Sequence, residues 1–198
     1  MIISLFYFIA LANTLTVAEF GLFATASATG VVLSRIIGLG FTSPLYRVST
    51  VKPRIAGVFA AGYLLASLVS LPLFALAAAA TFALFFSGQI AAMTFALIVV
   101  AEALLWRTAE VIIIVNNGMN RFGRASTLTI LGTAFRAIAA LLFALLAVKN
   151  LALWAWFYLA ANLASLLIGI LFFMPSMRWR LAFPLYRRHI GDSLAVSG

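Results

Sequence analysis

Long apolar stretches separated by short polar breaks run along the whole chain. Five of them are about as long as the roughly 20 residues that an α-helix needs to cross the hydrocarbon core of a bilayer. The polar breaks between them contain glycine, proline and asparagine, which favour turns. The pattern therefore predicts six membrane-spanning helices. The expected spans are residues 1–17, 19–42, 55–78, 90–115, 125–148 and 151–174.

The first apolar stretch is the shortest, because Asn13 interrupts it after residue 12. A signal peptide would account for a short apolar N-terminus, and Ala10-Leu11-Ala12 is similar to a cleavage site. A signal peptide also needs a positively charged start, and no basic residue precedes this stretch. We therefore favour a transmembrane helix that is either tilted and continues to about Val17 or lacks its beginning.

The boundaries of the other spans follow from their polar flanks. Residues 43–54 contain two prolines and three basic residues, so we expect a loop there. Pro72 falls inside the third span and predicts a kink. The sixth span begins with Trp154, Trp156 and Tyr158, which we place at interfacial depth. Two regions result: a six-helix bundle over residues 1–176 and a basic cytoplasmic tail over residues 177–198.

The composition agrees with a membrane protein of the all-α class. Hydrophobic residues make up 66% of the chain and charged residues 9%, whereas soluble domains are about one-quarter charged. The absence of cysteine, a single histidine and few carboxylates argue against a transition-metal site. No nucleophilic triad, phosphate-binding loop or other catalytic motif is present, so we expect neither an enzyme nor a cofactor.

The basic residues are concentrated in alternate loops. The net charge of +9 therefore indicates orientation in the bilayer rather than binding of nucleic acid. On one side of the membrane only Lys149 is basic. The other side carries Arg47, Lys52, Arg54, Arg121, Arg124, Arg178, Arg180, Arg187 and Arg188. This asymmetry predicts a multi-pass protein with both termini in the cytoplasm.

Five charged residues fall inside the expected spans: Arg35, Arg107, Arg136, Glu102 and Glu110. At about 1.5 Å per residue, Glu102 lies about 21 Å and Arg136 about 18 Å from the cytoplasmic ends of their helices, so these two can pair near the midplane. Arg35, Arg107 and Glu110 lie about 9–13 Å deep, close to one another. All five should face the interior of the bundle because a charge facing lipid is costly.

Three positive charges against two negative ones leave one unpaired positive charge. We therefore hypothesise a cationic aqueous cavity, open toward the cytoplasm, that binds an anionic headgroup through Arg35, Arg107 and Arg136. Glu102 and Glu110 would form ion pairs or take up a coupling ion. We expect Arg35→Ala and Arg136→Ala to abolish transport without removing the protein from the membrane. The alternative is that these residues are structural ion pairs, or arginines that extend to the interface.

Several short motifs resemble those of the bacterial polysaccharide flippases of the multidrug/oligosaccharidyl-lipid/polysaccharide exporter superfamily. The motifs are Ala18-Glu19-Phe20-Gly21-Leu22-Phe23-Ala24, Gly38-Leu39-Gly40, Pro44-Leu45-Tyr46-Arg47, Asn117-Gly118-Met119-Asn120-Arg121-Phe122-Gly123-Arg124 and Gly191-Asp192-Ser193-Leu194-Ala195-Val196-Ser197-Gly198. In the last motif Asp192-Ser193 replaces a Gly/Pro pair that is usual in the family.

The resemblance implies a function in the bacterial cytoplasmic (inner) membrane. Such flippases move undecaprenyl-diphosphate-linked glycans, precursors of lipopolysaccharide and exopolysaccharide, to the outer leaflet by alternating access of two six-helix lobes. In such a lobe, positive residues would hold the diphosphate. The resemblance implies this role for Arg35, Arg107 and Arg136 through their position within helices two, four and five. The sequence stops where a seventh helix would begin. We therefore expect one lobe, either a fragment or a partner of a second copy or a separate chain.

Two other functions remain open. The chain would also suit a non-transporting scaffold or anchor subunit of a polysaccharide synthase complex. It would also suit a membrane-embedded enzyme that acts on a lipid-linked substrate. Accumulation of lipid-linked sugar repeats on the inner leaflet after deletion favours the flippase, whereas loss of synthesis favours either of the others.

Overall fold

The computed structural model describes residues 2–182 and Tyr186, and these residues form helices with no β-strand among them. In chain order the α-helices are α1 (Ile2–Ala12), α2 (Val17–Leu33), α3 (Thr42–Val51), α4 (Ala56–Thr81), α5 (Ala92–Val100), α6 (Arg107–Gly118), α7 (Phe122–Ala144) and α8 (Leu151–Ile168). A 3₁₀ turn, η1 (Pro53–Ile55), precedes α4, and the π-helical segments η2 (Phe82–Phe86), η3 (Ala101–Trp106) and η4 (Gly169–Phe173) follow α4, α5 and α8.

The described helices form an all-α bundle that suits a membrane. Three stretches, Pro53–Phe86, Phe122–Ala144 and Leu151–Phe173, are long and apolar enough to cross a bilayer. The helix Val17–Leu33 is apolar but shorter. The continuous helix formed by α5, η3 and α6 carries three charged residues, Glu102, Arg107 and Glu110. These findings confirm the all-helical class and indicate a membrane protein, while a crossing by all six stretches stays a prediction.

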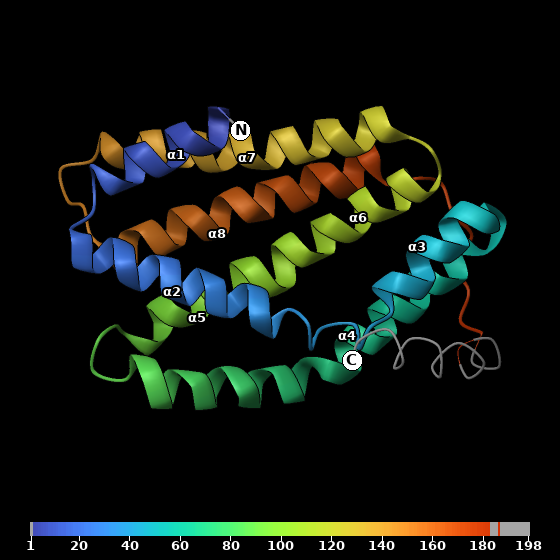
Figure 1. The fold of residues 1–198 in the computed structure, drawn as a ribbon, viewed down its shortest axis with the longest axis horizontal. Helices are drawn as coiled ribbons and strands as arrows, with labels where there is room; N and C mark the ends of the chain where they lie inside the picture. The colour runs from blue at the N-terminus through green and yellow to red at the C-terminus, as the bar shows by residue number, and fades with distance from the viewer. Residues whose placement is uncertain (1, 183–185, 187–198) are drawn as a thin grey trace.

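One large core holds most of the bundle together. Helix α7 packs between α1 and α8, and α2 packs on α5 (Figure 1). Trp154 is fully buried in this core and has Phe23, Phe143 and Tyr158 within 5.4–5.8 Å, measured between ring centroids. Trp154 and Tyr158 are thus core residues, and their interfacial depth stays a prediction.

The start of α2 is fixed by a capping box and by a contact to α8. The hydroxyl of Thr16 accepts a hydrogen bond from the backbone N–H of Glu19, and the Glu19 carboxylate accepts one from the backbone N–H of Thr16. The same carboxylate accepts the backbone N–H of Leu151 at 3.1 Å. Glu19 therefore joins the first residues of two helices that are far apart in the sequence.

The region after α2 differs from the sequence expectation in two ways. The second span ends at Leu33 rather than Thr42, because residues 34–41 form turns in which Gly38, Leu39 and Gly40 all have positive φ. Residues 42–51, which we expected to be a loop, form α3. Pro44 is compatible with that helix because it lies in the first turn, where a backbone N–H has no partner within the helix.

The third span contains Pro72, and α4 continues through it (Figure 1). Together with η2, α4 runs along the edge of the bundle opposite α7 (Figure 1). A second, smaller core of Leu45, Phe59, Tyr63, Val111 and Val115 joins α4 to α3 and α6. The predicted basic tail is described only as far as residue 182 and at Tyr186, so most of it, including Arg187, Arg188 and residues 191–198, lies outside the described residues.

Candidate functional site

A cavity of about 310 Å³ lies beside the large core, between α1, α2, η3, α7 and α8. It contains two of the five intramembrane charges that the sequence singled out, Glu102 and Arg136. The residues that line it are Tyr7, Phe8, Phe23, Ala24, Ser27, Ala28, Val31, Glu102, Thr133, Arg136 and Tyr158. The walls are thus mostly apolar, with a few polar groups at fixed positions, as is typical of ligand sites.

Glu102 lies in the π-helical segment η3 and is only 6% exposed. Its Oε1 atom accepts a hydrogen bond from the Ser27 hydroxyl at 2.7 Å and another from the Tyr158 hydroxyl. Helix α2 comes close to Glu102 at Gly30, where a Cβ atom would lie 2.8 Å from the Glu102 Cβ. A side chain at Gly30 would therefore push α2 away and break the bond from Ser27. Single π-helical turns of this kind occur frequently at functional sites.

Arg136 lies on α7 and is held by neutral groups rather than by a carboxylate. Its Nε and Nη2 atoms donate to Oδ1 of the fully buried Asn162 at 3.2 and 2.9 Å. Its guanidinium carbon lies 4.2 Å from the centroid of the Trp106 ring and 5.6 Å from that of Tyr158. Cation–π contacts stabilise an arginine most where water is excluded. The side chain is thus fixed with one edge of its guanidinium on Asn162 and its face on aromatic rings.

Glu102 and Arg136 line the same cavity, but the described residues contain no direct ion pair between them. A shared cavity agrees with the similar depth that we expect for them, whereas the direct pairing that we expected is absent. Tyr158 explains the separation, because its hydroxyl donates to Glu102 while its ring lies beside the Arg136 guanidinium. The cavity therefore presents a negative and a positive group that are each held separately, so either could meet a ligand.

The other three charges lie elsewhere. Arg107 and Glu110 form an ion pair on α6, with 2.5 Å between Nη1 and Oε2, and their side chains are 18% and 40% exposed. Arg107 also donates a long hydrogen bond of 3.5 Å to Thr42, and its Nε is buried without a partner. Arg35 is exposed in the turn that follows α2, so our expectation of an intrahelical Arg35 is wrong. The five charges therefore form no single cluster.

The cavity is open on one side, between α1 and α2. Phe8 and Val31 line it and are 49% and 50% exposed, and Ala24 and Ala28 are exposed as well. The opposite wall, made by Tyr158 and Glu102, is buried. Access to the charged groups thus runs from this open side inward.

Sequence reasoning missed the neutral residues that hold the charges. Asn162 and Tyr158 are four residues apart on α8, so they share one face of the helix, and Asn162 also donates to the Tyr158 carbonyl at 2.8 Å. An asparagine in the middle of an apolar span was the available signal, since polar residues in such spans face the interior. Nothing in the sequence distinguishes Ser27 from the other small residues of α2.

Among the described residues, no group of three or more histidine, cysteine, aspartate or glutamate side chains is placed to hold a metal ion. Comparison with protein-family models, with curated proteins and with solved structures finds no match for this chain. The function must therefore be argued from the cavity itself.

Proposed function

We propose that this chain is one lobe of an exporter that moves an anionic, lipid-linked glycan across the bacterial inner membrane. In this proposal all six apolar helical stretches cross the bilayer and both termini are cytoplasmic. The observation that carries the proposal is the cavity that Glu102 and Arg136 line inside an otherwise apolar bundle. A charged residue at such depth is costly unless a protected polar interior accommodates it, and such residues commonly mark substrate or ion pathways.

Arg136 is suited to an anionic diphosphate. Two of its three nitrogens are occupied by Asn162, while Nη1 donates no hydrogen bond within the described part of the chain. The planar guanidinium presents donors that match phosphate oxygens, and the stack on Trp106 fixes the direction in which they point. The free edge can thus meet an anion without a change in the rest of the side chain.

Glu102 gives the same cavity a site for a coupling ion. Its negative charge opposes that of an anionic substrate, so a cation bound at Glu102 would favour binding of the anion at Arg136. Thermodynamic linkage then requires that the substrate also tightens binding of the cation. Because each favours binding of the other, the cation and the substrate would cross together, which would couple transport to an ion gradient.

A second lobe fits the open side of the cavity. Alternating access needs two bundles that rock against each other around a central site. The exposed lining residues Phe8, Ala24, Ala28 and Val31 lie on the side that such a lobe would cover. The second lobe would be another copy of this chain or a separate chain.

The decisive experiment is deletion of the gene, followed by measurement of lipid-linked sugar repeats on each leaflet. We expect accumulation on the inner leaflet, restored to normal by the wild-type protein but not by Arg136→Ala. Loss of synthesis without an accumulated intermediate would contradict the transport function.

A scaffold subunit of a polysaccharide synthase complex is the second candidate, and one observation favours it. Both charges are held by hydrogen bonds within the bundle, as purely structural groups would be. Cysteine labelling separates the two, because the chain has no native cysteine. A transport cavity predicts that Ala28→Cys reacts with a small hydrophilic thiol reagent, whereas the lipid-exposed control Leu73→Cys does not. Equal lack of reaction at both positions would favour the scaffold.

A further inference from the structure

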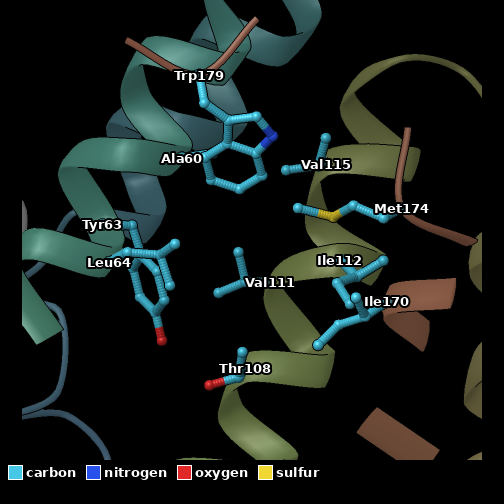
Figure 2. Close-up of a pocket in the computed structure, with 10 residues that line it drawn as sticks. All are labelled: Ala60, Tyr63, Leu64, Thr108, Val111, Ile112, Val115, Ile170, Met174 and Trp179. Carbon is cyan, nitrogen blue, oxygen red and sulfur yellow. The ribbon is translucent and has the colours of Figure 1, made fainter. Parts of the chain in front are cut away.

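A second pocket, of about 340 Å³, lies between α4, α6 and η4 and shares no lining residue with the charged cavity. Figure 2 shows its walls: Ala60, Tyr63 and Leu64 on one side, and Val111, Ile112 and Val115 on the other. Thr108 and the Tyr63 hydroxyl are at one end and Trp179 at the other (Figure 2). The volume lies at the lower end of the roughly 300–1,000 Å³ that is typical of ligand pockets.

The pocket runs along the helices rather than across them. Thr108 and Val115 mark its two ends on α6, which places them about 10 Å apart at 1.5 Å per residue. The walls between these ends are aliphatic and aromatic. The pocket therefore has the direction and the lining of a segment of lipid chain that enters a membrane from its surface.

Four basic residues surround the Trp179 end. Arg178 and Arg180 flank Trp179, and Lys52 and Arg54 directly precede α4; all four are exposed. The tail lies directly against the start of α4, since a Cβ atom on Gly57 would be 2.5 Å from the Arg178 carbonyl oxygen. Both pairs of basic residues are thus at the same end of the pocket.

None of this positive charge is neutralised by the described carboxylates. Glu19 caps α2, Glu102 lies in the charged cavity, and Glu110 pairs with Arg107. A basic cluster beside a tryptophan at a helix end is the arrangement that binds anionic headgroups at the cytoplasmic face of a membrane.

We propose that this pocket binds an anionic membrane phospholipid, with part of one acyl chain between α4 and α6 and the phosphate at Arg178 and Arg180. The lipid fills the space that separates α4 from α6, and it thereby joins α4 to the rest of the bundle. This site is independent of transport, because it uses neither Glu102 nor Arg136.

The test is native mass spectrometry of the full chain in mild detergent with equal amounts of phosphatidylglycerol and phosphatidylcholine of the same chain length. We expect phosphatidylglycerol to be retained in preference. Arg178→Gln with Arg180→Gln should weaken its binding about 30-fold, at about tenfold for each 1.4 kcal/mol and about 1 kcal/mol for each basic residue near an anionic surface. The matched control is Arg121→Gln with Arg124→Gln, an exposed basic pair at the start of α7, which should retain the preference.

The chain contact is tested separately. Leu64→Trp fills the pocket and should reduce retention of phosphatidylglycerol at least tenfold, whereas Leu68→Trp, on the exposed surface of the same helix, should not. Brominated phosphatidylglycerol should also quench the fluorescence of Trp179, measured as the difference between the wild type and Trp179→Phe. This second readout needs no pocket-filling variant.

Three outcomes would overturn the proposal. The first is equal retention of the two lipids by the wild type. The second is equal loss of phosphatidylglycerol binding in a test variant and its control, either the two arginine double variants or Leu64→Trp and Leu68→Trp. The third is displacement of the phospholipid by a polyprenyl diphosphate. The last would instead assign the pocket to the transported lipid.

Discussion

Two groups of charges lie in different surroundings. The deep group is Glu102 in η3 and Arg136 on α7, and the shallow group is Arg107 and Glu110 on α6. In η3, Glu102 is almost fully buried and its hydrogen bonds come from the neutral hydroxyls of Ser27 and Tyr158. About one turn later, in α6, Arg107 and Glu110 contact each other directly and are partly exposed. The deep group uses neutral donors and an aromatic stack, whereas the shallow group uses an ion pair.

The difference shows which group is available to a ligand. A direct ion pair satisfies both charges and leaves little net field for a third group. Glu102 and Arg136 are each held in place but are not neutralised by a direct contact with each other. Hydrogen bonds from neutral groups fix geometry while they preserve charge. We therefore propose a binding role for the deep group and a stabilising role for the shallow one.

The largest expected effect is that of Arg136→Ala on transport. Removal of the guanidinium leaves the cavity with Glu102 as its only charge and leaves Oδ1 of Asn162 without its donor. Truncating one partner of a buried charge pair with a ligand costs roughly 2–5 kcal/mol of binding, so transport should fall at least about 30-fold. The measurement is glycan export in a deletion strain that carries the variant.

Arg136→Lys sharpens the same comparison, because it keeps the positive charge. A lysine can neither form the two bonds to Asn162 nor stack as a planar group on Trp106, so we expect an intermediate loss of about tenfold. The amount of protein in the membrane, measured by immunoblot, is the control for both variants. Full activity of Arg136→Ala at normal protein levels would contradict a binding role.

The next effect concerns stability and distinguishes charge from hydrogen bonding at Glu102. Glu102→Gln retains an oxygen acceptor for Ser27 and Tyr158, whereas Glu102→Ala leaves the buried Tyr158 hydroxyl without its partner. An unpaired buried polar group costs about 1–3 kcal/mol. We therefore expect Glu102→Ala to unfold at a lower temperature in detergent than Glu102→Gln. The free energies of unfolding of the two variants should differ by about 1–3 kcal/mol.

Glu102→Gln should nevertheless lose ion-coupled transport, because it removes the charge. Glu110→Ala, at a half-exposed position, is the matched control and should alter stability by no more than about 0.5 kcal/mol. Coupled transport by Glu102→Gln at the wild-type rate would remove Glu102 from the coupling mechanism.

Periodicity and charge depth predict much of this architecture from the sequence. The helical class, the breaks near Asn13 and Lys149, and the common depth of Glu102 and Arg136 all follow from them. These features depend on distances along one helix, which the sequence specifies directly. The end of α2 at Leu33 does not follow, because residues 34–41 are as apolar as the helix before them. Only their φ angles show the turn.

The partners of the charges are also beyond prediction, for a different reason. Asn162, Trp106 and Ser27 contact Arg136 or Glu102 from three separate parts of the chain, and no spacing rule connects them. Similar depth and opposite sign suggested direct pairing of Glu102 with Arg136. Tyr158 lies between them, and its burial depends on how α8 is rotated against α2 and η3.

A smaller effect is expected for the shallow pair. A double-mutant cycle of Arg107→Ala and Glu110→Ala should give a coupling energy of about 0.2–1 kcal/mol, the usual range for partly exposed pairs that solvent screens. Thermal unfolding of the two single variants and of the double variant supplies the measurement. A coupling above about 2 kcal/mol would mean that the pair is desolvated in the assembled protein, and its role would then be closer to that of the deep group.

The smallest effect should come from Arg35→Ala, where sequence and structure lead to opposite expectations. A position inside the second span would place Arg35 beside the other charges and make it essential. The structure instead exposes it in the turn after α2, outside the charged cavity. Exposed substitutions usually change stability by no more than about 0.5 kcal/mol, and transport should stay near the wild-type rate. A loss as severe as that of Arg136→Ala would show that the turn over residues 34–41 contacts the substrate during transport, and the binding site would then extend from the cavity to the end of α2.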